Sequence, residues 1–169
     1  MRTDRRIAVT LAAAVLAGGA GAGVAQAGPA AGRGSDAPSA CRPANHTATI
    51  TEADNTAGHR HYRVTLTAPR GYEPCELAGS PTGLRFSHDG TDSGITAGRY
   101  GSQQTAVAFG PGRPVHFDIQ VPSGGPGALA DEAAFTLRAP DGEIPGTSYA
   151  EGALTVAAGT LVGPVRSGA

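Results

Sequence analysis

Lysine and tryptophan are absent from this chain, cysteine occurs only twice, and aromatic residues make up 5% of its 169 residues. All 13 basic residues are arginine, and the formal net charge is −1. The chain therefore has no basic surplus to neutralise phosphates, which argues against a nucleic-acid-binding protein. Two cysteines cannot form a thiolate zinc module, which needs four ligands in paired spacing. The length suits one domain and leaves no room for a large multidomain enzyme.

Residues 1–27 have the pattern of a secretory signal peptide. Three arginines precede an apolar stretch from Ile7 to about Leu16, and Ala25-Gln26-Ala27 offers an A-x-A cleavage site. The apolar stretch is too short for a membrane span, which needs about 20 residues. We therefore expect a secreted, extracellular protein with no membrane span. The Arg5-Arg6 pair leaves both Sec and twin-arginine export open.

The rest of the chain divides into a leader and a domain. Residues 28–40 are small, polar and rich in proline and glycine, so we expect a flexible leader that buries little apolar surface. The folded domain is expected over residues 41–166. After cleavage the chain would carry 10 arginines and 13 acidic residues, a net charge of −3 that favours no anionic partner.

Hydrophobic residues within this domain recur with a period of two. The clearest case places Val115, Phe117, Ile119 and Val121 on one face of a strand. Alternation of this kind predicts strands with one buried face, and proline- and glycine-containing turns separate them. The pattern predicts an all-β fold, an antiparallel β-sandwich of seven to eight strands. Residues 127–134 are the only helical candidate. The other alternating segments are 46–51, 60–68, 83–88, 105–109, 133–137, 154–156 and 161–165.

The two cysteines are expected to form a disulfide. Cys41 precedes the first expected strand, and Cys75 lies in a proline-rich turn after the second. Export would carry both thiols into an oxidising compartment, where two lone cysteines of a small domain usually pair. Antiparallel strands return the chain to the same edge, so the two ends can lie close together.

Two motifs resemble those of a known family. They are Gly58-x-x-x-Tyr62-x-Val64-x-Leu66 and the later Pro74-Cys75-Glu76-Leu77-x-Gly79-Ser80-Pro81. This pattern resembles an actinobacterial family of secreted and lipoprotein domains of unknown function, which has an early Cys and a Cys-x-Leu-x-Gly-x-Pro motif. The resemblance covers nearly all of residues 41–165 and implies an immunoglobulin-like sandwich with no assigned activity.

A histidine pair on the second expected strand raises the possibility of a metal site. Gly58-His59-Arg60-His61 resembles the Gly-x-His-x-His strand of copper-zinc superoxide dismutases, although the whole chain has only five histidines. Residues two apart on a strand point the same way, so His59 and His61 could share one metal with His88 or Asp89. The other interpretation places both imidazoles on a solvent-facing surface beside Arg63. We favour this second interpretation and expect no cofactor.

Catalytic motifs are weaker still. Gly146-Thr147-Ser148-Tyr149-Ala150 is one residue away from a nucleophile elbow, but the alternating helices of an α/β-hydrolase are absent from the pattern. Asp131 and Glu132 are adjacent, so their carboxylates diverge on either a helix or a strand. The first segment is interpreted as a turn and the second as a solvent-exposed turn or the start of a helix, and we expect no enzyme.

Three classes of function stay open at this point. The first is a non-catalytic extracellular module that binds a protein or a cell-envelope component, and we favour it. The second is a metal-binding or redox-protective extracellular domain that uses His59 and His61. The third is a hydrolase. The sequence predicts no nucleic-acid partner and leaves the oligomeric state open.

Overall fold

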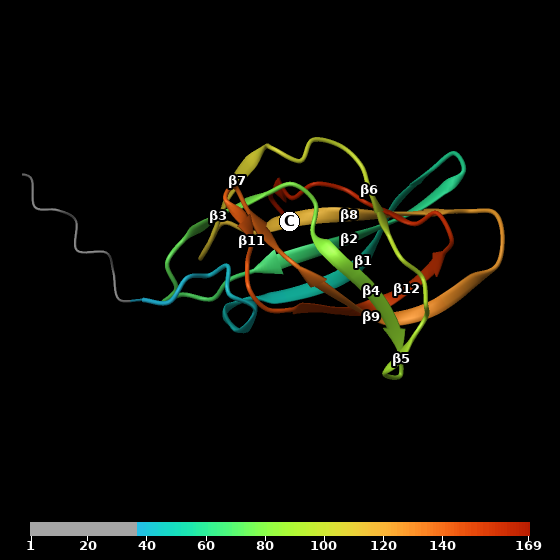
Figure 1. Ribbon diagram of the computed structural model, residues 1–169, viewed down its shortest axis with the longest axis horizontal. Coiled ribbons are helices and arrows are strands. Elements are labelled where there is room, and N and C mark those ends of the chain that lie inside the picture. Colours follow the sequence, from blue (N-terminus) through green and yellow to red (C-terminus); the bar gives the residue numbers. More distant parts are fainter. Residues whose placement is uncertain (1–36) are drawn as a thin grey trace, which may run out of the picture. The chain divides into compact units, whose positions relative to one another are not determined.

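The computed structural model of the chain describes residues 37–169, and this part is built from β-strands (Figure 1). It contains one turn of 3-10 helix, η1 (Pro43–Asn45), and no α-helix among the described residues. The all-β prediction is therefore confirmed. The strands of four or more residues are β1 (Thr47–Thr56), β2 (His59–Thr67), β3 (Cys75–Ala78), β4 (Thr82–His88), β7 (Ala106–Phe109), β8 (Val115–Pro122), β9 (Gly127–Thr136) and β12 (Ser148–Ala157). The two-residue strands are β5 (Thr91–Asp92), β6 (Gly98–Arg99), β10 (Arg138–Ala139), β11 (Gly142–Glu143), β13 (Leu161–Val162) and β14 (Arg166–Ser167).

Ten of these strands form one sheet. Its order is β5-β4-β9-β12-β1-β2-β8-β13-β6, and β14 also pairs with β8. The remaining strands form two small antiparallel pairs, β3 with β7 and β10 with β11.

The large sheet is mixed, because β1 runs parallel to β12 and β13 runs parallel to β6. The prediction of an antiparallel fold is wrong at these two pairs, and the immunoglobulin-like sandwich is not confirmed. The physical reason is that alternation shows which residues of a strand are buried, but it does not show the direction of the neighbouring strand.

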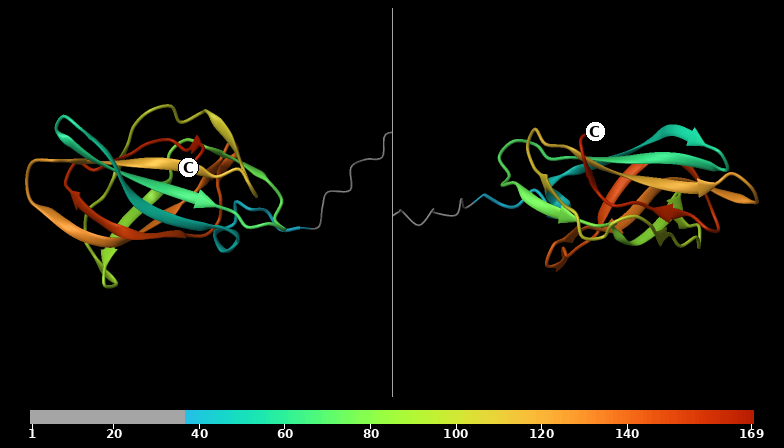
Figure 2. Two further views of the ribbon diagram at one scale, coloured as in Figure 1. Left: turned by 180° about the vertical axis from the view of Figure 1, so that it is seen from behind. Right: turned by 90° about the horizontal axis from the view of Figure 1, so that it is seen from above.

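The sheet curls back on itself (Figures 1 and 2). Strand β8 lies four places from β9 in the strand order. In a flat sheet that separation would be about 19 Å, because neighbouring strands lie about 4.8 Å apart. The rings of Phe117 on β8 and Phe135 on β9 nevertheless meet edge to face, with 5.1 Å between their centroids.

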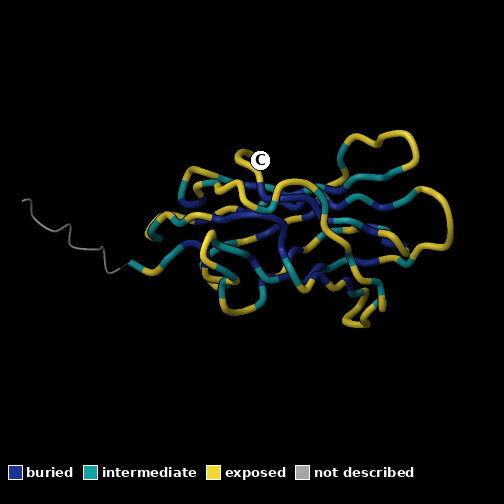
Figure 3. Tube along the Cα trace, turned by 45° about the horizontal axis from the view of Figure 1, so that its top comes forward, coloured by how far each residue is buried: buried dark blue, intermediate teal, exposed yellow. Residues whose placement is uncertain are grey.

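The hydrophobic core fills the inside of this curl, where Figure 3 shows the buried chain in dark blue. The predicted stripe of β8 is confirmed, because Val115, Phe117, Ile119 and Val121 are all completely buried. Between them His116, Asp118 and Gln120 are only half-buried. The stripe therefore has the predicted register.

The helical candidate at residues 127–134 is instead the first part of β9. This segment pairs with β12 along most of its length and buries Ala130 and Ala133 against the core. Sheet pairing outweighs the weak helix propensity of its alanines and acidic residues, which is at most a fraction of a kcal/mol per residue. The prediction of a helix was wrong for this reason.

The predicted disulfide is confirmed. Cys41 and Cys75 are bonded, with 6.0 Å between their Cα atoms and 34 positions between them in sequence. The predicted signal peptide, residues 1–27, lies outside the described residues, as does the leader up to residue 36. The last part of the expected leader belongs to the fold. Ser39 forms a parallel bridge with Glu73, and Ala40 is completely buried.

In the part of the chain that the structure describes, no helix is long and apolar enough to cross a membrane.

Candidate functional site

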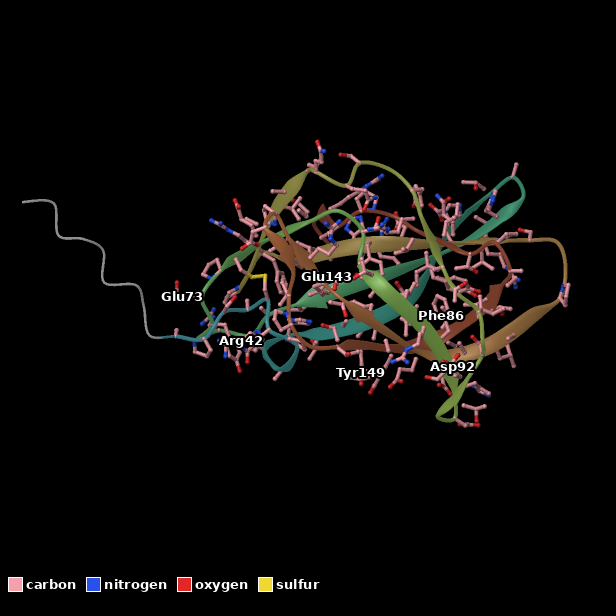
Figure 4. All side chains as sticks on the ribbon, viewed as in Figure 1. Arg42, Glu73, Phe86, Asp92, Glu143 and Tyr149 are labelled. Carbon is pink, nitrogen blue, oxygen red and sulfur yellow. A yellow bond between two sulfur atoms is a disulfide. The ribbon has the colours of Figure 1, made fainter. Side chains whose placement is uncertain are left out.

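An open groove of about 1000 Å³ lies beside the disulfide. Three segments line it, namely residues 39–44 before β1, the start of β3, and the β10–β11 hairpin with the loop that follows. Figure 4 shows the disulfide, Arg42 and Glu143 toward one end of the domain and Asp92 toward the other. The volume is at the upper end of the roughly 300–1,000 Å³ typical of binding clefts. The groove is therefore a candidate for a binding site.

Covalent and backbone bonds hold the groove in place. The Cys41–Cys75 bond ties the first lining segment to the second. In the third, Gly142 follows Pro140-Asp141 and has a φ of +146°, a conformation that favours glycine, and so allows the tight turn of the hairpin. The Ile144 N–H then donates to the Leu137 carbonyl at 2.9 Å, which closes the base of the hairpin. The groove is therefore largely preformed.

The surface of the groove combines apolar contacts with an excess of negative charge. Glu76, Asp141 and Glu143 are exposed and line the groove together with one guanidinium group, that of Arg42. Glu143 also accepts a hydrogen bond from the Thr82 hydroxyl at 2.6 Å. Three carboxylates against one cation favour a positively charged ligand. The apolar lining residues are Pro43, Ala44, Ala139, Pro140, Ile144 and Pro145, together with the disulfide.

Sequence reasoning did not single out this groove. The sequence pattern assigns no binding role to residues 140–142, and it predicts only a structural bond for Cys41 and Cys75. The spacing of prolines at 140 and 145 was the available signal, because it marks a segment that cannot join a central strand.

A serine–histidine pair lies near the groove but does not line it. The ring of His46 contacts the Ala40 carbonyl through Nδ1 and the Ser148 hydroxyl through Nε2, each at 3.0 Å. Because a carbonyl can only accept, Nδ1 carries the proton, and Ser148 donates to Nε2. Burial lowers the pKa of His46, which keeps the ring neutral. Ser148 is only 2% exposed at the start of β12, so this pair fastens β12 to the segment before β1 and offers no accessible nucleophile.

His59 and His61 lie on the same side of β2, as predicted. Their ring centroids are 6.4 Å apart, and His61 Nε2 is already hydrogen-bonded to the Thr56 hydroxyl at 2.8 Å. Within the described residues, neither belongs to a group of three metal-ligating side chains whose ligand atoms lie within 4.8 Å of one another.

The residues proposed as their partners lie elsewhere. His88 and Asp89 form such a group with Asp131, at the β4–β5 turn. His88 Nδ1 lies 2.9 Å from Asp131 Oδ2, and His88 Nε2 lies 3.7 Å from Asp89 Oδ2. The sequence missed this group because Asp131 was assigned to a turn or helix, and only the register of β9 against β4 places it beside His88.

Comparison with known proteins gives one family. A model described as "Domain of unknown function (DUF4232)" matches residues 41–165. No curated protein and no solved structure matches the chain. The expected resemblance to a family of domains of unknown function is confirmed over the same residues.

Proposed function

Because the chain belongs to the DUF4232 family, whose description assigns no activity, we propose its function from the groove beside the disulfide. The protein is a secreted, non-catalytic β domain that binds an extended segment of another extracellular or cell-envelope protein. The observation that carries this proposal is a preformed groove of about 1000 Å³ with an apolar lining and a negative surface.

The lining indicates the chemistry of the bound segment. No aromatic side chain is among the groove residues, so a ligand would not be held by ring stacking. Prolines, alanines and Ile144 instead offer contacts to small aliphatic side chains. The three carboxylates of Glu76, Asp141 and Glu143 favour at least one arginine or lysine in the ligand. We therefore expect a basic, aliphatic peptide segment.

Two further features support an extracellular setting. Residues 1–27 have the pattern of a signal peptide. The Cys41–Cys75 disulfide also forms one side of the proposed site, and such bonds persist in oxidising compartments.

The test is selection of binding peptides from a library of random heptapeptides displayed on phage. We expect the enriched sequences to carry arginine or lysine, and their binding to weaken at high salt. Replacing Asp141 with Arg should abolish binding, whereas Asp54→Arg, an exposed carboxylate on β1 outside the groove, should leave it unchanged. Enrichment of acidic peptides, or equal effects of the two variants, would refute the proposal.

The alternative function is a metal-binding or redox-protective extracellular domain that uses His59 and His61. The observation in its favour is that both rings lie on one side of β2. Two imidazoles that share a tetrahedral ion would have centroids about 5.4 Å apart, at Zn–N distances of about 2.1 Å. The observed 6.4 Å would therefore require one ring to turn. Elemental analysis of the purified protein, compared with that of His61→Gln, tests this alternative.

A further inference from the structure

His88, Asp89 and Asp131 lie where the core-facing rows of two neighbouring strands change from apolar to polar. On β4 the buried row of Leu84 and Phe86 continues to His88. On β9 the row that contains Ala133 continues to Asp131. Ser87 of β4 pairs with Glu132 of β9, so His88 and Asp131 are brought side by side at the rim of the sheet.

The contacts of the imidazole define which nitrogen is free. His88 Nδ1 lies 2.9 Å from Asp131 Oδ2, and because a carboxylate can only accept, we assign the proton of the neutral ring to Nδ1. The Asp89 amide also donates to the same carboxylate, at 3.1 Å. The Asp131 carboxylate therefore holds both the His88 imidazole and the backbone of Asp89. In the neutral ring this leaves Nε2 with a lone pair, and Nε2 lies 3.7 Å from Asp89 Oδ2.

The remaining separation is too long for a hydrogen bond and suits a metal ion. His88 Nε2 and Asp89 Oδ2 are 3.7 Å apart, beyond the roughly 3.2 Å limit of a good N–H···O bond. An ion about 2.1 Å from each atom would span this gap at an angle of about 124°, wider than the tetrahedral angle by about 15°. Asp131 on Nδ1 would complete the carboxylate–histidine–metal arrangement that is common around zinc.

We propose that His88 and Asp89 bind a zinc ion, with Asp131 as the carboxylate that positions the imidazole. Zinc is favoured over calcium and magnesium because the site offers an imidazole nitrogen, whereas those ions take oxygen ligands. The charges of Asp89 and Asp131 together balance a divalent cation. Both direct ligands are exposed, so water would complete the coordination. This proposal is independent of the groove and uses neither His59 nor His61.

Isothermal titration of the purified full chain with zinc chloride tests the proposal. We expect one zinc ion per chain. His88→Gln and Asp89→Asn should each remove binding, and Asp131→Asn should weaken it by about 10- to 100-fold, the usual effect of losing an orienting carboxylate. Matched controls are His116→Gln, on β8, and the double change His59→Gln with His61→Gln. Calcium and magnesium should not compete.

A second measurement needs no variant. In a titration of the unchanged protein followed by NMR, zinc should shift the resonances of residues 88, 89 and 131. No binding at millimolar zinc would overturn the proposal. Shifts centred on His59 and His61, or full zinc binding by His88→Gln, would also overturn the proposal. The distances from His88 to Asp89 and Asp131 would then be explained by an ion pair between the ring and the two carboxylates.

Discussion

Replacing Phe117 with alanine should be among the most destabilising single changes in this domain. The side chain is completely buried on β8, and its ring meets Phe135 edge to face at 5.1 Å. Burying a phenylalanine contributes about 1.5–3 kcal/mol relative to leaving it exposed, and an aromatic pair adds about 0.5–1.5 kcal/mol. The sum, about 2–4.5 kcal/mol, agrees with the roughly 3–5 kcal/mol typical of Phe→Ala in a core.

Urea unfolding followed by circular dichroism measures this change in the free energy of unfolding. His116→Ala is the matched control, because the half-buried imidazole contacts the Gly168 carbonyl through Nδ1 outside the core, and its loss should cost about 0.5 kcal/mol or less. A double-mutant cycle with Phe135→Ala should give a coupling energy of about 0.5–1.5 kcal/mol. If His116→Ala were the more damaging change, the register of β8 would be wrong by one residue. A coupling energy near zero would mean that the sheet does not curl as described.

Three other measurements test the fold. Replacing both Cys41 and Cys75 with serine should lower the free energy of unfolding by about 4 kcal/mol, the value that the chain-entropy model gives for a loop of 34 residues. Equal urea midpoints for the unchanged protein with and without reductant would contradict this. Gly152→Ala should prevent normal folding as judged by circular dichroism, because Gly152 has a φ of +148° and a Cβ at this position would collide with the backbone of β1. Gly124→Ala is the control and should fold normally, because open space surrounds that position. Burial lowers the pKa of His46 in the folded protein, so just below pH 6.5 the unfolded chain binds more protons than the folded one. As the pH is lowered from 6.5, the free energy of unfolding should therefore decrease until the folded-state pKa is passed. In His46→Gln this part of the pH dependence should disappear, and an unchanged profile would refute the assignment.

Much of the fold could be predicted from local pattern alone. The alternation along β8 gave both the strand and its buried face, because a strand with one face in the core must bury every second residue. The disulfide followed from the number of cysteines and their places at the ends of expected strands. The strand depends on residues that are close in sequence, and two cysteines allow only one disulfide within the chain.

The remaining features depend on how distant segments meet. The parallel pairing of β1 with β12 joins residues about 100 positions apart, and no periodicity within either strand indicates its direction. The groove is assembled from residues near 41, 75 and 141, which share no sequence pattern. The group of His88, Asp89 and Asp131 depends on the register of β9 against β4. Sequence patterns could identify the individual strands, turns and polar residues, but they could not show which of these segments lie side by side in the fold.

The place of β12 in the sheet also constrains the order in which the chain can assemble during synthesis. This strand lies between β9 and β1, and its Ser148 contacts His46, 102 positions earlier. Strands β1 and β2 can pair as soon as they are made, but the edge of β1 that receives β12 stays open until the last quarter of the chain has emerged. Contacts over such distances close slowly, because the intervening loop must be ordered first. A nascent chain that lacks residues 148–157 therefore cannot complete this fold.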